Sequence, residues 1–298
     1  MSSVASPVTP VSVDQPPKHN FDWLSIGWFS SLLFLCYAPV LWMLVKQWNN
    51  DEDMGHGFFV PVIAAYIAWQ NREKLLAIDI KPNYWGLALV LLSGAQLYIA
   101  TLGAELFTTR MAFIEAVVGT VLFLGGTQAL KVLAFPLMLL LFMVPIPAII
   151  YNRITFPLQL FASQVAATAL ELLGVPVLRD GNVLELPSQK LSVVEACSGI
   201  RSLLSLTFLS LVYSYFFDQR RWMRWVLFLC TIPIAIVANA GRVTLTGIMS
   251  EIRPDLATGL PHEMSGWVIF MIALAILIFV HQLISKVANA YALAQQPK

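Results

Sequence analysis

Charged residues are scarce in this chain, and their scarcity excludes a soluble globular domain. Of its 298 residues, 12% are charged and 58% are hydrophobic, and the mean hydropathy is +0.74. Soluble domains average about 25% charged residues, so too little polar surface is available here to cover a water-exposed fold. We therefore predict an all-α polytopic membrane protein.

Three further features are missing. The net charge is only +1 and no basic cluster is large enough for a nucleic-acid footprint, so we expect lipid, peptide or small-molecule partners and no nucleic acid. No internal repeat is evident, so the inverted symmetry common in transporters has no support. Residues 1–20 are proline-rich and lack the basic-then-apolar order of a cleaved signal peptide. We expect a disordered cytoplasmic tail there, a membrane domain over 21–290 and a short cytoplasmic tail over 291–298.

Cysteine is also rare, and the familiar hydrolase motifs are absent. Cys36 and Cys230 lie within apolar runs, whereas Cys197 lies at the boundary of one, so the three form neither a CxxC metal pattern nor a disulfide framework. The chain has no HExxH and no GxSxG, so a zinc protease or serine hydrolase is poorly supported. We predict no metal site and no cofactor.

What the chain does contain is a series of apolar runs of membrane-spanning length. The second run is short, but Pro61 suits a first helical turn. Arg220 and Arg221 form a basic stop typical of a cytoplasmic helix end, which places both termini in the cytoplasm and Cys197 on the outer side. We predict about eight transmembrane helices, at Trp23–Val45, Phe58–Gln70, Tyr84–Leu102, Met111–Gly126, Val132–Ile150, Ser198–Phe217, Trp225–Gly241 and Ser265–Ser285.

The longest segment between spans, residues 151–196, predicts a small periplasmic cap between spans five and six. Its first half has helical apolar spacing with interspersed polar residues, which is typical of a helix lying along the membrane interface. In its second half, Asp180-Gly181-Asn182 and Pro187-Ser188-Gln189-Lys190 are turn signals between short apolar runs. These patterns predict a β-structured cap that leads directly into Cys197.

Three motifs at span boundaries could form one outer site: Glu195-Ala196-Cys197-Ser198-Gly199, Asn239-Ala240-Gly241-Arg242 and Pro261-His262-Glu263-Met264-Ser265-Gly266-Trp267. A helix N-terminus and a nearby guanidinium both favour a cysteine thiolate, so Cys197 is a candidate nucleophile. Arg242 near hydrocarbon needs a partner or a water-filled cavity. His262 can serve as a general acid or base with a thiol.

Each of these residues also has a simpler interpretation. Cys197 could be a small packed hydrophobe, Arg242 a snorkelling side chain and His262 a solvated loop residue. Four more residues are candidates for supporting or substrate-binding roles. Arg201 could reach the thiolate or bind lipid phosphate, Asn239 shares the helical face of Arg242, and Glu195 and His56 are outer polar residues, of which His56 could equally be an ordinary loop residue.

With these motifs assembled, the chain resembles the exosortase/archaeosortase family of integral-membrane cysteine transpeptidases. The resemblance runs from Trp48 through the last span. The family's cysteine matches Cys197 in EACSGIRSLL, its arginine matches Arg242 in NAGR, its histidine matches His262 in PHEMSGW, and HGFFVP around His56 is similar to its N-terminal block. The chain is similar to a stand-alone exosortase, of the B type.

The resemblance implies a function in the inner membrane of Gram-negative bacteria that make exopolysaccharide. The partners would be membrane lipid and proteins whose C-terminal PEP-CTERM signal has a Pro-Glu-Pro motif, a transmembrane helix and a basic tail. Cys197 would attack the scissile carbonyl to give a thioester, Arg242 would stabilise the oxyanion or thiolate, and His262 would protonate the leaving amine. An unknown acceptor nucleophile would then take the acyl group on the periplasmic side.

Two alternatives remain open from the sequence. One is a transporter or channel for an anionic solute, with Arg201, Arg242 and His262 along its path. The other is plain intramembrane proteolysis, in which water takes the acyl group.

Overall fold

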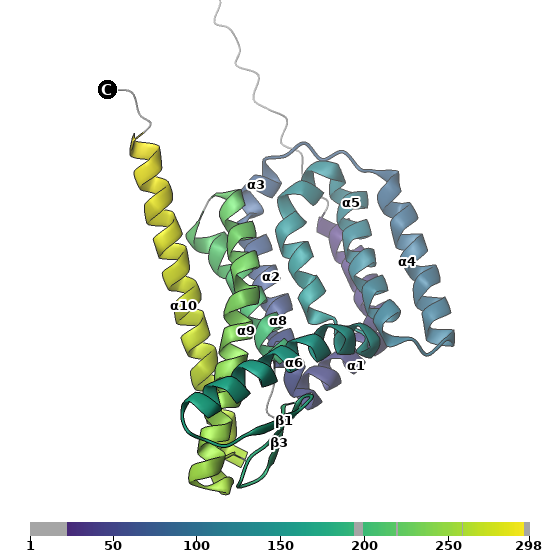
Figure 1. Cartoon of the computed structure of the whole chain (residues 1–298). Helices are drawn as coiled ribbons and strands as arrows, with labels where there is room; N and C mark the ends of the chain where they lie inside the picture. Colours follow the sequence, from purple (N-terminus) through teal and green to yellow (C-terminus); the bar gives the residue numbers. More distant parts are fainter. Residues whose placement is uncertain (1–22, 194–198, 219, 258, 295–298) are drawn as a thin grey trace, which may run out of the picture.

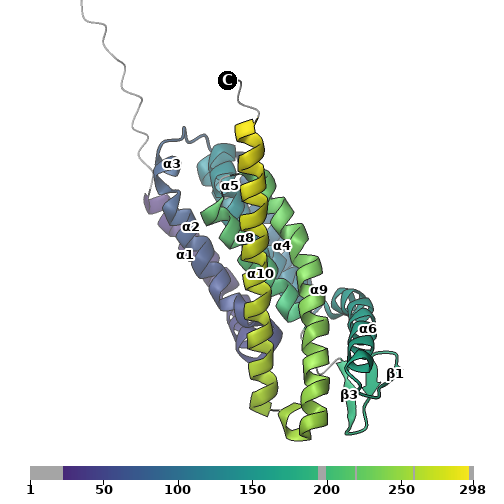
Figure 2. The same ribbon diagram turned by 60° about the vertical axis from the view of Figure 1, so that its left-hand side comes forward.

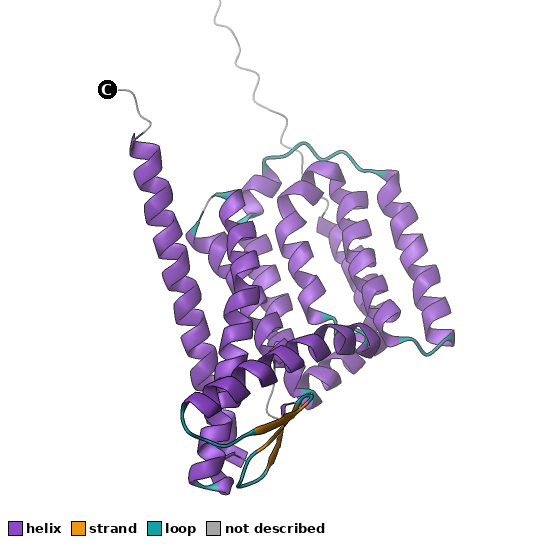
Figure 3. Ribbon diagram, in the orientation of Figure 1, coloured by secondary structure: helices purple, strands orange, loops and turns teal. Residues whose placement is uncertain are grey.

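The computed structural model describes residues 23–193, 199–218, 220–257 and 259–294; the side chains of 23, 52–53, 199–202, 221 and 291–294 are outside the description. Long helices run side by side along one axis, and α6 crosses them near one end (Figures 1 and 2). We call this the sheet end, because the three strands lie there (Figure 3). The α-helices are α1 (Trp23–Asn50), α2 (Phe59–Gln70), α3 (Arg72–Leu76), α4 (Tyr84–Leu102), α5 (Leu106–Leu139), α6 (Ala148–Leu172), α8 (Gly199–Phe217), α9 (Arg221–Ile252) and α10 (Gly259–Ala294), with short 3-10 turns η1 (Glu52–Phe58), η2 (Leu140–Met143) and η3 (Pro254–Ala257).

The helical membrane class is confirmed. Within the described residues, five helices are long and apolar enough to cross a membrane, namely α1, α4, α5 with η2, α9 and α10. The apolar part of α8, Leu203–Phe217, is shorter, and α2 has 12 residues. The predicted number of eight spans therefore stays a prediction.

α5 consists of two helical segments that meet at a sharp kink at Gly126. It therefore contains the predicted run Met111–Gly126 and the first part of the predicted run Val132–Ile150. Gly126 has φ 72° and ψ −171°, a conformation open essentially to glycine alone. A β-carbon there would also lie 2.1 Å from the Lys81 carbonyl oxygen. The run predicted over Val132–Ile150 was too long at its end. Pro145 and Pro147 lack backbone N–H groups and force an extended chain between η2 and α6.

α9 and α10 are both longer than predicted, and this moves two candidate residues. α9 continues past Gly241 because nothing breaks the helix before Arg253-Pro254. Arg242 is therefore inside a helix rather than at its end. α10 begins at Gly259 (φ 61°), with Pro261 tolerated in its first turn. His262 is accordingly a helical residue and not the loop residue that the sequence predicted, and α10 runs past the expected boundary at 290.

The predicted β-structured cap is confirmed, with α6 lying across the bundle as expected of an interfacial helix. Strands β1 (Leu178–Asp180), β2 (Val183–Glu185) and β3 (Lys190–Ser192) form an antiparallel sheet in the order β1-β2-β3. One face of the sheet buries Leu184, Leu191 and Val193 against Leu170 of α6 and Val243 of α9. The loop before β3 is tied to the end of α9, since the Ser188 amide donates to Glu251 Oε1 at 3.0 Å.

Candidate functional site

The structure describes the surroundings of the candidate nucleophile rather than the nucleophile itself. Cys197 and Glu195 lie outside the described residues, as does the side chain of Arg201. Gly199, the first described residue of α8, follows Cys197 by two positions.

Arg242 of α9 and His262 of α10 are brought together at the sheet end. Arg242 Nη2 lies 3.3 Å from His262 Nε2. The arginine is 9% exposed and the histidine is partly buried. Because a guanidinium only donates hydrogen bonds, Nε2 of the imidazole must be the acceptor. The pair therefore combines a buried positive charge with a proton-accepting nitrogen, as acyl transfer through a thiolate requires.

Two neighbours that the sequence did not single out complete this pair. Thr246, one turn after Arg242 on α9 and fully buried, has its hydroxyl 3.5 Å from His262 Nδ1. Gly266, one turn after His262 on α10, lies against the guanidinium, so that a β-carbon there would be 2.9 Å from Arg242 Cζ. Both could have been found from the sequence by the spacing of four, which puts each on the same helical face as a candidate.

A small cavity adjoins the guanidinium. Its volume is about 10 Å³, close to the minimum that one water molecule needs. Asn239 and Arg242 supply its polar lining and Leu206 of α8 part of its apolar lining. The predicted sharing of one helical face by Asn239 and Arg242 is thus seen, and the cavity lies where α8, α9 and α10 meet.

His56 lies on another side of α8. From η1, its Nε2 is 3.2 Å from the Phe142 carbonyl oxygen, and its Nδ1 is 3.5 Å from the Ser205 hydroxyl on α8. Ser205 directly precedes Leu206, which lines the cavity beside Arg242, so His56 contacts the same turn of α8 that borders this cavity. His56 is built into the contact between η1, η2 and α8, rather than being a simple loop residue.

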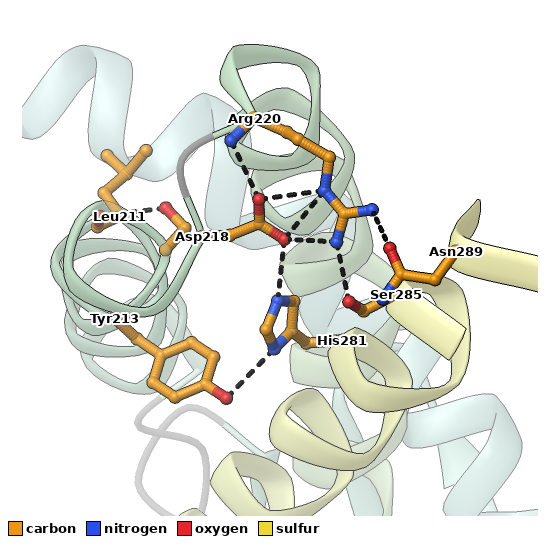
Figure 4. A network of polar contacts seen from close by, with 8 residues as sticks. Leu211, Tyr213, Asp218, Arg220, His281, Ser285 and Asn289 are labelled. Carbon is orange, nitrogen blue, oxygen red and sulfur yellow. Dashed lines mark hydrogen bonds and ion pairs between the residues drawn. The ribbon is translucent and has the colours of Figure 1, made fainter. Parts of the chain in front are cut away.

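A second polar cluster lies at the far end of the bundle, where α8 turns into α9 (Figure 4). Asp218 is buried and accepts from Arg220 Nη2 at 2.8 Å and from His281 Nε2 at 3.2 Å. His281 Nδ1 lies 3.0 Å from the Tyr213 hydroxyl, and Arg220 also donates to Ser285 of α10 at 2.6 Å.

This cluster holds α10 against the α8–α9 turn. The hydrogen bonds from Arg220, above all, keep the pKa of Asp218 well below its ordinary value, against the opposing effect of its burial. His281 lies within α10 and was not among the candidate residues identified from the sequence. Its partners in this cluster, Asp218 and Tyr213, are more than sixty positions away along the chain. A local sequence pattern therefore cannot predict these contacts.

No metal site is assembled by the described part of the chain, where no three His, Cys, Asp or Glu side chains converge.

Comparison with known proteins identifies the family. The family model described as "Transmembrane exosortase (Exosortase_EpsH)" matches residues 48–279, which is well over half of the chain. No curated protein matches significantly, and no solved structure does. The match covers η1, the cap and the helices that carry Arg242 and His262. The chain belongs to the transmembrane exosortase family.

Proposed function

We propose that this protein is a membrane-embedded cysteine transpeptidase that cleaves C-terminal PEP-CTERM sorting signals and transfers the upstream protein to an acceptor. Membership of the exosortase family supports a sorting transpeptidase in general. The observation that carries the residue assignment is the 3.3 Å approach of Arg242 Nη2 to His262 Nε2, beside the helix whose first described residue follows Cys197 by two positions.

In the first half of the reaction, the Cys197 thiol replaces Arg242 Nη2 as the donor to His262 Nε2, which accepts the thiol proton, and the thiolate sulfur attacks the scissile carbonyl carbon. Arg242 stabilises the thiolate and then the oxyanion. As the intermediate collapses, the carbon–nitrogen bond breaks, the imidazolium gives its proton to the leaving amine, and a thioester on Cys197 remains.

In the second half, an acceptor amine or hydroxyl attacks the thioester carbonyl. His262 takes the acceptor's proton and returns it to the departing thiolate or to solvent. The acceptor, whose identity is open, keeps the acyl group. Burial of Arg242 supports this assignment, because the attraction between its positive charge and a thiolate or oxyanion is stronger where water is scarce.

Orientation is part of the proposal. The basic residues Arg220 and Arg221, where α8 turns into α9, favour a cytoplasmic position for that end of the bundle. Arg242 and His262 lie toward the sheet end, because Val243, next to Arg242, packs against the strands of the cap. We therefore place the site on the periplasmic side of a bacterial inner membrane.

The test is co-expression with a protein that carries a Pro-Glu-Pro-tailed signal, followed by mass spectrometry of its new C-terminus. We expect a shortened product with the wild type and the intact precursor with Cys197→Ala. A product with a free carboxyl group would assign hydrolysis, and a product with added mass would assign transfer. Equal cleavage by Cys197→Ala would contradict the proposal.

A further inference from the structure

The Arg242–His262 pair is held from both of its helices by residues outside the proposed chemistry. We propose that Gly266 and Thr246 are positioning residues, Gly266 for the guanidinium of Arg242 and Thr246 for the imidazole of His262. This inference rests on the proposed function of the pair. It adds two residues that set how the pair meets the substrate.

Gly266 leaves the space that the guanidinium occupies. A β-carbon at this position would lie 2.9 Å from both Cζ and Nη2 of Arg242, whereas non-bonded heavy atoms settle at roughly 3.5 to 4.0 Å. The obstructed group is the end of a flexible side chain and not backbone. Alanine would therefore push the guanidinium away by roughly 0.5 to 1 Å and leave the α9–α10 packing in place.

The displacement of the guanidinium would move Arg242 Nη2, the nitrogen that contacts His262. Nη2 is the Arg242 nitrogen that faces His262 Nε2 at 3.3 Å, and it is one of the two atoms that the new methyl group would strike. A misplacement of about 1 Å in a catalytic group can cost about 10²-fold in rate. Gly266 thus sets the position of the donor on which oxyanion stabilisation depends.

Thr246 acts on the other partner through the imidazole tautomer. Since Nε2 accepts from Arg242, a neutral His262 carries its proton on Nδ1. Nδ1 lies 3.5 Å from the Thr246 hydroxyl, which can accept that proton, and Thr246 is fully buried. Thr246 therefore favours the Nδ1–H form, in which the Nε2 lone pair accepts from Arg242 in this structure and can accept the thiol proton when that hydrogen bond opens.

The first experiment compares processing by matched variants in the co-expression assay. We expect Gly266→Ala to reach the membrane at wild-type level and to lose about 10²-fold in processing rate. The control is Gly94→Ala on α4, where a β-carbon likewise meets nothing within 4 Å; it should process normally. Equal processing by the two variants would overturn the role of Gly266.

Thr246 has a matched pair of substitutions. Thr246→Val keeps the shape and removes the hydroxyl, so it should lose a factor of about 10 to 100, while Thr246→Ser should restore processing. Valine at wild-type rate would overturn the role of Thr246.

A second measurement needs no activity. The protein is labelled with 15N-histidine, and its NMR spectrum is recorded in detergent micelles. The chain has four histidines, so the signals that are lost in His262→Gln are those of His262. At pH 8 we expect the Nδ1–H pattern for His262 in the wild type and in Thr246→Ser, and its loss in Thr246→Val. An unchanged pattern in Thr246→Val would overturn the inference. A wild type that shows this pattern but processes no substrate would instead contradict the proposed function.

Discussion

Replacement of Asp218 by asparagine tests the polar cluster that joins α10 to the α8–α9 turn. Asn keeps the size of the side chain but removes its charge and turns one accepting oxygen into a donor. The two carboxylate oxygens accept from the Arg220 amide at 2.8 Å, from Arg220 Nη2 at 2.8 Å and from His281 Nε2 at 3.2 Å. At least one of these buried donors would be left facing another donor.

The expected decrease in the free energy of unfolding follows from the loss of these hydrogen bonds. A hydrogen bond to a charged group contributes about 1.5 to 3 kcal/mol. The side chain of Arg220 is 30% exposed, so water replaces part of its loss, and we expect Asp218→Asn to lower the free energy of unfolding by about 2 to 3 kcal/mol. Loss of this magnitude should lower Tm by roughly 4 to 10 °C.

The assay is thermal unfolding in micelles, followed by tryptophan fluorescence. The control is Asp79→Asn, because Asp79 has an exposed ion pair with Lys81 at 3.8 Å that should contribute less than about 1 kcal/mol. Equal Tm values for the two variants would refute the reasoning.

Acid provides a second readout of the same cluster. The folded-state pKa of Asp218 is lowered, so its stabilising contribution is fully present above the unfolded value of about 3.9 and is lost as pH falls below it. Wild-type stability should therefore decline more steeply than that of Asp218→Asn below about pH 4. Parallel curves would contradict this linkage.

Three further predictions concern the site, the orientation and the fold. Arg242→Lys should insert normally but lose about 10²-fold or more in processing rate, because lysine lacks the planar donor fork; near-normal processing would favour a snorkelling role. A phosphatase active only outside the cytoplasm should be active when fused after Lys190 and inactive after Arg221, and the reverse would contradict the orientation. Gly126→Ala should greatly reduce folded protein, measured by gel filtration, because both its backbone conformation and the Lys81 carbonyl exclude a side chain. Gly94→Ala, where a β-carbon meets nothing within 4 Å, should fold normally.

Local signals in the sequence predicted much of the fold. The span predicted over Tyr84–Leu102 has the bounds of α4, since Asn83 caps its first turn by accepting from the Trp85 amide and Gly103 follows its end. The turn signals around Gly181 and Ser188 likewise predicted the three-stranded sheet. The ends of α9 and α10 were missed because polar residues within a helix were taken as its boundary.

The site was predictable by residue type and not by geometry. Arg242 and His262 were both candidates, but their contact joins two helices, and periodicity along one helix cannot show it. The spacing of four places Thr246 and Gly266 on the same helical faces as Arg242 and His262, but their contacts join the two helices and come from the structure. The contact between His281 and Asp218 also joins residues 63 positions apart, which no local pattern in the sequence indicates.

The central claim is that Cys197 forms an acyl-enzyme with the support of Arg242 and His262, and trapping that intermediate tests it most directly. Wild-type protein is incubated briefly with a substrate peptide in the absence of an acceptor and is then quenched with acid, which preserves a thioester. Intact-protein mass spectrometry should show one added acyl group on the wild type, released by hydroxylamine and absent from Cys197→Ala. An adduct on Cys197→Ala, or product released by that variant, would contradict the account.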